Sequence, residues 1–152
     1  KEIFFGQING SIGETSALFL LVGGLVLIAT RVISWHIPVS FLASVAVFAL
    51  VTNAVDDSVY AGPAFHLFTG GVMIGAFFMA TDYVTSPMFP LGKILFGVGC
   101  GVLTMVIRLW AGYPEGVSFA VLLMNALVPI LDTYTRPKKF GARRLAAAKG
   151  GE

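Results

Sequence analysis

The sequence is poor in charged residues. Only 12% of its 152 residues are Asp, Glu, Lys or Arg, whereas 57% are hydrophobic. A water-soluble domain usually has about a quarter of its residues charged. This chain therefore lacks the charge needed to cover a surface that faces water, and its composition predicts an integral membrane protein.

Cysteine is also scarce, since Cys100 is the single one. One cysteine excludes an internal disulfide, a zinc site with several cysteines and an iron–sulfur cluster held within this chain. Cys100 lies in an apolar, glycine-rich stretch, so we interpret it as a small packing residue. The sequence shows no other pattern typical of a metal site.

Motifs of soluble enzymes are missing as well. The sequence contains no Walker loop, no dinucleotide-binding glycine motif after a strand and no zinc-protease motif. We therefore predict no catalytic residue in the chain itself, so its chemistry requires a cofactor or other subunits. The opening residues lack a signal-peptide pattern, and we expect the chain to start partway through a larger protein.

The long apolar runs predict about five transmembrane helices. A helix needs about 20 mostly apolar residues to cross about 30 Å of hydrocarbon. The sequence offers five such segments, at residues 15–33, 38–55, 63–81, 91–111 and 115–134. We accordingly expect a transmembrane domain over residues 1–135 and a basic tail over residues 136–152.

The basic residues set the expected orientation. The tail holds six Lys and Arg residues, and such clusters remain on the cytoplasmic side: Arg136, Lys138, Lys139, Arg143, Arg144 and Lys149. Counting back through five crossings leaves the N-terminus outside and the C-terminus in the cytoplasm. The net charge of +2 comes with basic residues gathered in this one tail, so it does not indicate a nucleic-acid partner.

An odd number of spans has a structural meaning. Many transporters pair two inverted repeats, each with an odd number of spans, around a site at the middle of the membrane. A five-span segment fits one such repeat.

The third segment is the least regular. Gly71 and Gly75 have the spacing that lets two helices approach closely. The segment then leads into residues 81–90, which contain hydroxyl groups and two prolines. This stretch is either an ordinary cytoplasmic loop or a broken helix whose polar side chains, including Thr81 and Asp82, line a site.

Three charged residues are expected at the outer face. Glu14 is interpreted as a helix cap or as a neighbour of a cofactor cavity. Arg108 either extends outward to the interface or holds an anion or a carboxylate. Glu115 either stabilises its own helix N-terminus or frames a pocket together with Arg108.

Asp82 and Asp132 are expected at the inner face. Asp82 either caps the following helix or coordinates a cation. Asp132 lies at a helix C-terminus, where the helix dipole disfavours an anion, so it requires either an ion pair with Arg136 or a bound cation. Asn125 lies near the middle of the membrane and either bonds to another helix or contacts a ligand.

Six strings in the same order resemble one protein family. They are residues 10–16 (GSIGETS), 31–38 (RVISWHIP), 77–82 (FFMATD), 107–110 (IRLW), 113–116 (YPEG) and 125–132 (NALVPILD). Together they cover about residues 4–140 and resemble the C-terminal half of the D subunit of the Rnf electron-transport complex. The related B subunit of the sodium-pumping NADH:quinone oxidoreductase shares four of them.

This resemblance implies a function. Rnf complexes pass electrons between ferredoxin and NAD and couple the transfer to Na⁺ or H⁺ movement across the cytoplasmic (inner) membrane of bacteria or archaea. The resemblance also implies two inverted five-span repeats, as in urea transporters, and the other Rnf subunits as partners.

The resemblance further implies a covalent FMN. The flavin is attached to a threonine of a Ser-x-Ala-Thr motif upstream of this chain, and the Ala80-Thr81 pair lacks the serine of that motif. The family often has proline where this sequence has Tyr83, which weakens any argument for a rigid kink there. We expect six residues near the flavin: Gly13, Glu14, Thr15, Ser16, Arg108 and Glu115. We expect four along the ion pathway: Thr81, Asp82, Asn125 and Asp132.

Two other functions remain open from the sequence. One is a passive small-solute channel of the urea-transporter type without a flavin. The other is a structural scaffold whose polar residues hold neighbouring subunits. The sequence does not distinguish Na⁺ from H⁺, and it does not give the direction of electron flow.

Overall fold

The computed structural model describes residues 16–55, 62–69, 71–112 and 116–137 of the chain. All regular structure in these ranges is helical. In chain order the elements are α2 (Ala17–Ala29), α3 (His36–Val55), α4 (Pro63–Phe68), α5 (Val72–Ile74), the π-helical turn η1 (Gly75–Met79), α6 (Pro90–Trp110) and α7 (Val117–Thr135). The prediction of an all-helical chain is confirmed for these residues.

Three of the helices are long and apolar enough to cross a membrane, namely α3, α6 and α7. Their bounds differ by no more than two residues from the segments expected from hydropathy. The two other expected spans differ more. Helix α2 is apolar but has 13 residues, and the third segment is divided into α4, α5 and η1. The membrane class is therefore supported, whereas a count of five complete spans is not.

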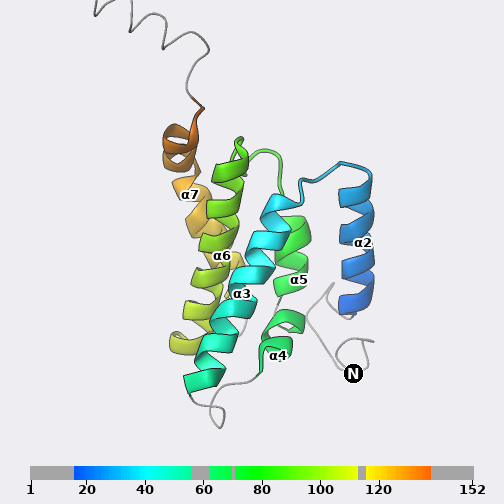
Figure 1. Ribbon diagram of the computed structural model, residues 1–152, viewed down its shortest axis with the longest axis vertical. Helices are drawn as coiled ribbons and strands as arrows, with labels where there is room; N and C mark the ends of the chain where they lie inside the picture. The colour runs from blue at the N-terminus through cyan, green and yellow to red at the C-terminus, as the bar shows by residue number, and fades with distance from the viewer. Residues whose placement is uncertain (1–15, 56–61, 70, 113–115, 138–152) are drawn as a thin grey trace, which may run out of the picture.

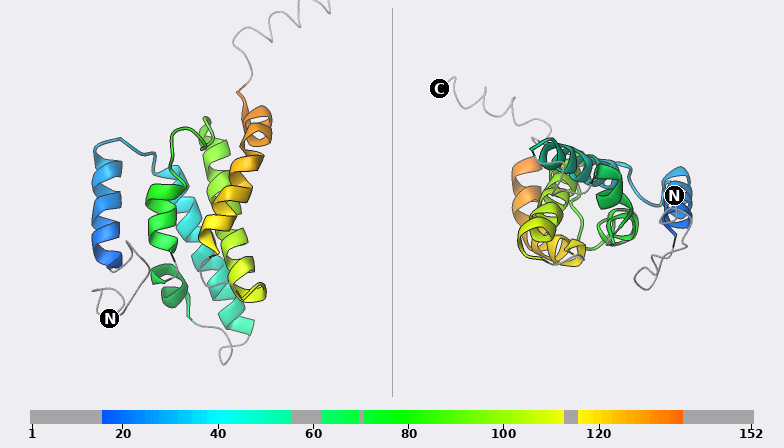
Figure 2. Two further views of the ribbon diagram at one scale, coloured as in Figure 1. Left: turned by 180° about the vertical axis from the view of Figure 1, so that it is seen from behind. Right: turned by 90° about the horizontal axis from the view of Figure 1, so that it is seen from below.

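Helix α2, helix α3, the broken segment from α4 to η1, helix α6 and helix α7 run in alternating directions (Figure 1). The start of α2, the end of α3, the start of α4 and the end of α6 lie at one end of the bundle. The end of α2, the start of α3, the start of α6 and the end of α7 lie at the other. Helix α2 contacts α5 and η1 and stands at the edge of the bundle, on the side away from α7 (Figure 2).

The most extensive contact between two helices is the one between α3 and α6. Gly97 and Gly101 of α6 lie against Ser40 and Ser44 of α3, so closely that a Cβ on either glycine would overlap the serine side chain. The two glycines are four residues apart on α6, and the two serines are four residues apart on α3. Each helix therefore presents its two residues on one face. Such close packing was expected from the sequence at Gly71 and Gly75, and this second pair of glycines on α6 was not predicted.

The glycines of the third segment have other uses. Gly75 lies against the side chain of Val117, which brings η1 close to α7. Gly71 adopts a left-handed conformation with φ of 80°, which other L-residues adopt only at a cost. Gly75 therefore sets how close η1 lies to α7, and Gly71 provides the left-handed turn before α5.

Large apolar side chains cover much of the outer surface. Phe19 of α2, Val47 of α3, Leu91 of α6 and Leu122 of α7 are all more than half exposed, from 59% to 76%. Such a surface is costly in water, and it suits the hydrocarbon that composition predicts as the solvent of this chain.

Candidate functional site

The third segment is interrupted between α4 and α5. Helix α4 ends at Phe68, Thr69 is extended, and the helix resumes at Val72 after the left-handed Gly71. The five residues of η1 follow, with the Ala80 N–H donating to the carbonyl of Gly75 at 2.8 Å. Breaks and π-turns of this kind leave backbone groups without their usual helical partners.

Arg108 of α6 binds the backbone at this interruption. Its Nη1 donates to the carbonyl oxygen of His66 at 2.8 Å, and its Nη2 donates to that of Thr69 at 2.6 Å. The hydroxyl of Thr69 donates to the carbonyl of Phe65. In hydrocarbon an unpaired carbonyl costs several kcal/mol, so one side chain satisfies two groups that the break would otherwise expose. The sequence predicted a functional role for Arg108 but not these partners.

A buried imidazole lies at the same interruption. The side chain of His66 is 8% exposed, and its Nε2 is buried without a hydrogen-bond partner among the described residues. Its carbonyl oxygen is one of the two that Arg108 binds. This end of α4 thus combines a guanidinium group, two carbonyl oxygens and an imidazole nitrogen.

The expected flavin residues are described only in part. Gly13, Glu14, Thr15 and Glu115 lie outside the described residues. Ser16 directly precedes α2, and its side chain makes no capping hydrogen bond. The start of α2 and the end of α6, which carries Arg108, lie at one end of the bundle (Figure 1), as the alternation of spans predicted.

A non-helical loop over residues 81–89 carries the expected inner-face groups. The hydroxyl of Thr81 donates to the carbonyl of Phe77 at 2.7 Å. The exposed carboxylate of Asp82 accepts a hydrogen bond from the Thr85 hydroxyl at 3.2 Å. The hydroxyl of Tyr83 donates to the carbonyl of Val32, which joins this loop to the one between α2 and α3.

Asp132 of α7 is attached to the same loop. Its Oδ1 accepts the backbone N–H of Met88 at 3.0 Å, and it forms no ion pair with Arg136, which is exposed. The compensation expected from Arg136 is therefore replaced by a backbone donor. One neutral N–H leaves most acceptor positions of a carboxylate open, so Asp132 retains capacity for a proton or a cation.

Asn125 lies on the same face of α7 as Asp132, because seven residues correspond to about two helical turns. Its Oδ1 is buried and has no hydrogen-bond partner among the described residues. Pro129 follows four residues later inside the helix and has no N–H to donate to the Asn125 carbonyl. Among the described residues, the side-chain Oδ1 of Asn125 therefore has no hydrogen-bond donor, and its backbone carbonyl lacks the N–H that normally bonds it in a helix.

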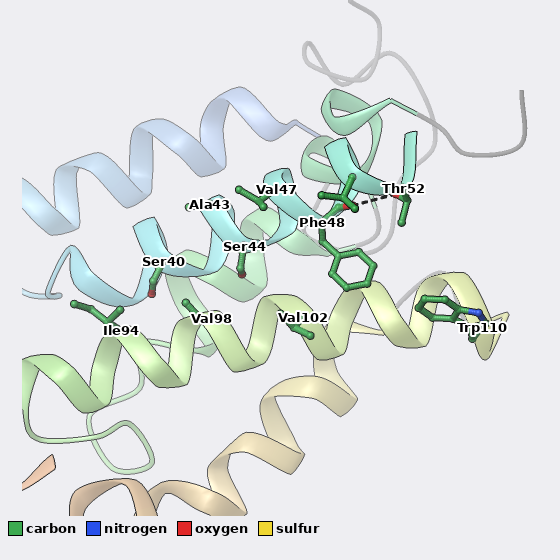
Figure 3. Close-up of a pocket in the computed structure, with 11 residues that line it drawn as sticks. Ser40, Ala43, Ser44, Val47, Phe48, Thr52, Ile94, Val98, Val102 and Trp110 are labelled. Atoms are coloured by element: carbon green, nitrogen blue, oxygen red, sulfur yellow. Dashed lines mark hydrogen bonds between the residues drawn. The ribbon is translucent and has the colours of Figure 1, made fainter. Parts of the chain in front are cut away.

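A groove of about 730 Å³ runs between α3 and α6 on the outside of the bundle (Figure 3). Its lining is apolar apart from the indole N–H of Trp110 and the hydroxyls of Ser40, Ser44 and Thr52. Each of these three hydroxyls donates to a carbonyl of its own helix at 2.6–3.1 Å. None of the expected flavin or ion-pathway residues lines it.

The break at Thr69 to Gly71 was not predicted from the sequence, and neither was its contact with Arg108. Hydropathy is insensitive to an interruption whose residues are themselves apolar or small. The available signal was the pair Gly70-Gly71, which directly follows a threonine inside an apolar run.

Comparison with known proteins gives consistent matches. A family model described as the NQR2, RnfD, RnfE family matches residues 1–141. The chain is 49% identical over 150 residues to the D subunit of the ion-translocating oxidoreductase complex of Stutzerimonas stutzeri, covering 96% of this chain and 42% of the relative. It is 49% identical to the D subunit of the proton-translocating ferredoxin:NAD(+) oxidoreductase complex of Clostridium ljungdahlii, covering 95% of this chain and 44% of the relative. It is 47% identical to the D subunit of the Na(+)-translocating ferredoxin:NAD(+) oxidoreductase complex of Acetobacterium woodii, with the same coverage of 95% and 44%. The chain thus spans less than half the length of these relatives.

Proposed function

Since the chain belongs to the NQR2, RnfD, RnfE family, we propose that it is the C-terminal part of the D subunit of an ion-translocating ferredoxin:NAD⁺ oxidoreductase complex. The observation that carries this proposal is the similarity to the D subunits of three ion-translocating oxidoreductase complexes, at 47–49% identity along about 95% of the chain. Two of these complexes are named ferredoxin:NAD(+) oxidoreductases. In this function the chain guides a cation or proton across the membrane while the complex transfers electrons. Its partners are the other subunits of the complex.

The three long apolar helices support a place in the membrane. We propose that this is the cytoplasmic (inner) membrane, with the N-terminus outside and the tail over residues 136–152 in the cytoplasm. The transmembrane domain over residues 1–135 is then one of two inverted, urea-transporter-like repeats. The alternating directions of the elements and the broken third segment support this arrangement, because broken helices mark the binding region of such transporters.

The proposed ion pathway uses residues on two elements. Asp82 and Thr81 belong to the loop after η1, and Asp132 is hydrogen-bonded to the same loop at Met88. Asn125 continues the path two turns further along α7. Carboxylate, amide and backbone oxygens suit both Na⁺ coordination and proton relay. Transfer past Asp132 then requires its negative charge, whereas the hydrogen bond to Met88 holds it in place.

We further propose FMN as the cofactor of the complete subunit, carried by a threonine outside this chain. When bound, FMN supplies one-electron and two-electron transfer. The fit of the described residues is limited, because Arg108 directs Nη1 and Nη2 to backbone carbonyls of its own chain. Those two nitrogens are not free for a phosphate, so we derive no step through the flavin from them.

The test is coupled transport by the assembled complex. Inverted membrane vesicles containing the complex with its full-length D subunit are supplied with reduced ferredoxin and NAD⁺, and Na⁺ uptake and internal pH are followed. We expect ion uptake to accompany NAD⁺ reduction. In-gel fluorescence of the full-length D subunit tests the flavin. Electron transfer without ion uptake, or solute flux through the purified subunit alone, would contradict the proposal.

A further inference from the structure

The C-terminal end of α4 is a place where a cation is stabilised. The last carbonyls of a helix point beyond its end and carry the negative pole of the helix dipole. In broken transmembrane helices these ends and the unwound carbonyls coordinate a free cation. Here the carbonyl oxygens of His66 and Thr69 converge on one group, the guanidinium of Arg108.

Arg108 comes from a different helix from the one it binds. It lies 42 residues after His66, near the end of α6, and two separate nitrogens make the two contacts. A planar guanidinium presents several donors in a fixed geometry, so it bridges two acceptors that a lysine ammonium meets only as a point charge. The Arg108 side chain thus holds the two carbonyl groups in position and places a positive charge beside them.

We propose that Arg108 is a tethered cation: its guanidinium occupies the cation position at the end of α4 and so keeps mobile cations from binding there. Without it, the carbonyls of His66 and Thr69 form a vacant position for a small cation. Arg108 is then a positioning residue that leaves the oxygens around Asn125 and Asp132 as the place where transported ions bind.

The first experiment measures rescue by guanidinium ion. The full-length D subunit with a C-terminal fluorescent protein, assembled in its complex, is heated and followed by size-exclusion chromatography with fluorescence detection. We expect Arg108→Ala to lower the melting temperature and millimolar guanidinium chloride to raise it again by about 2–4 °C relative to choline chloride, as for a ligand that binds the native state. The wild type and the control Arg136→Ala should show no guanidinium-specific shift.

Two outcomes overturn the proposal. One is an Arg108→Ala protein that assembles but gains no guanidinium-specific shift, and the other is an equal shift in the wild type. Arg108→Lys covers the case in which Arg108→Ala does not assemble. A lysine reaches one carbonyl at a time, so the melting temperature of the Arg108→Lys protein should fall below that of the wild type. An unchanged melting temperature would overturn the proposal.

A second measurement separates positioning from mere folding, and it rests on the proposed function. In vesicles with equal amounts of assembled complex, Arg108→Lys should lower the number of ions moved per electron transferred at least twofold. An unchanged ratio would refute the positioning role. Uncoupled electron transfer in the wild type would instead refute the proposed function, while the guanidinium result would stand by itself.

Discussion

Gly97 of α6 lies directly against Ser40 of α3, and the backbone of α3 is close behind the serine. A Cβ atom at Gly97 would lie 2.9 Å from the carbonyl oxygen of Ile37 as well as overlapping the Ser40 side chain. The neighbour is therefore backbone, which cannot rotate away as a side chain can. This contact sets the distance between the two helices.

Gly97→Ala should destabilise the protein because it pushes α3 and α6 apart, at a cost of about 1–3 kcal/mol. Gly99→Ala is the matched control on the same helix, since its new methyl would meet the flexible end of Met124. Thermal unfolding of the full-length D subunit in detergent measures both. Equal melting temperatures for the two variants would contradict the role given to the α3–α6 contact.

Gly71→Ala should damage the break itself. The left-handed φ of 80° costs an alanine about 1–2 kcal/mol, and relief of that strain shifts the carbonyls that Arg108 binds. Gly112→Ala is the control, because Gly112 also has a positive φ, of 65°, and no atom of the described residues lies within 4 Å of the position of its missing Cβ. Both variants should lose stability, and we expect only Gly71→Ala to lower the ions moved per electron. A similar loss of coupling in both would contradict this.

Asp132→Asn should separate charge from position. The amide oxygen of asparagine can still accept the N–H of Met88, so α7 stays attached to the loop while the negative charge is lost. We expect at least a tenfold loss of ion-coupled electron transfer with a melting temperature close to that of the wild type, and Asp132→Ala should lower both. Intact coupling in Asp132→Asn would remove this residue from the ion pathway.

Asn125→Leu should affect transport more than folding. The Asn125 oxygen has no partner among the described residues, so replacing the amide with an apolar group of similar size removes no hydrogen bond that the described fold uses. We expect weaker coupling and an unchanged or higher melting temperature. A drop in melting temperature would show that the amide bonds to another part of the protein.

The long helices were predictable because hydropathy reports them directly. Residues 38–55, 91–111 and 115–134 were expected, and the helices run over His36–Val55, Pro90–Trp110 and Val117–Thr135. Each is a mostly apolar run of the length that a membrane requires. The first and third segments are also mostly apolar, but composition carries no information on where a helix ends within an apolar run.

The partners of the polar residues were not predictable in the same way. Sequence reasoning placed Arg108 and Asp132 at opposite ends of the chain's spans, and the alternation of the elements agrees with that. Their observed partners are the backbone carbonyls of His66 and Thr69 and the backbone N–H of Met88. Every residue offers such groups, so only the folded arrangement shows which ones are within reach. The flavin and ion-pathway roles remain predictions.

The three hydroxyl groups of the groove between α3 and α6 are all turned back on their own helix. Between membrane helices, polar side chains are a main source of adhesion beyond packing. Apart from the indole N–H of Trp110, the lining of this groove therefore offers a neighbour no hydrogen-bonding group. Between Ser40 and Thr52 an apolar occupant such as a lipid acyl chain is therefore selected by shape, and it can slide along α3 without breaking a hydrogen bond.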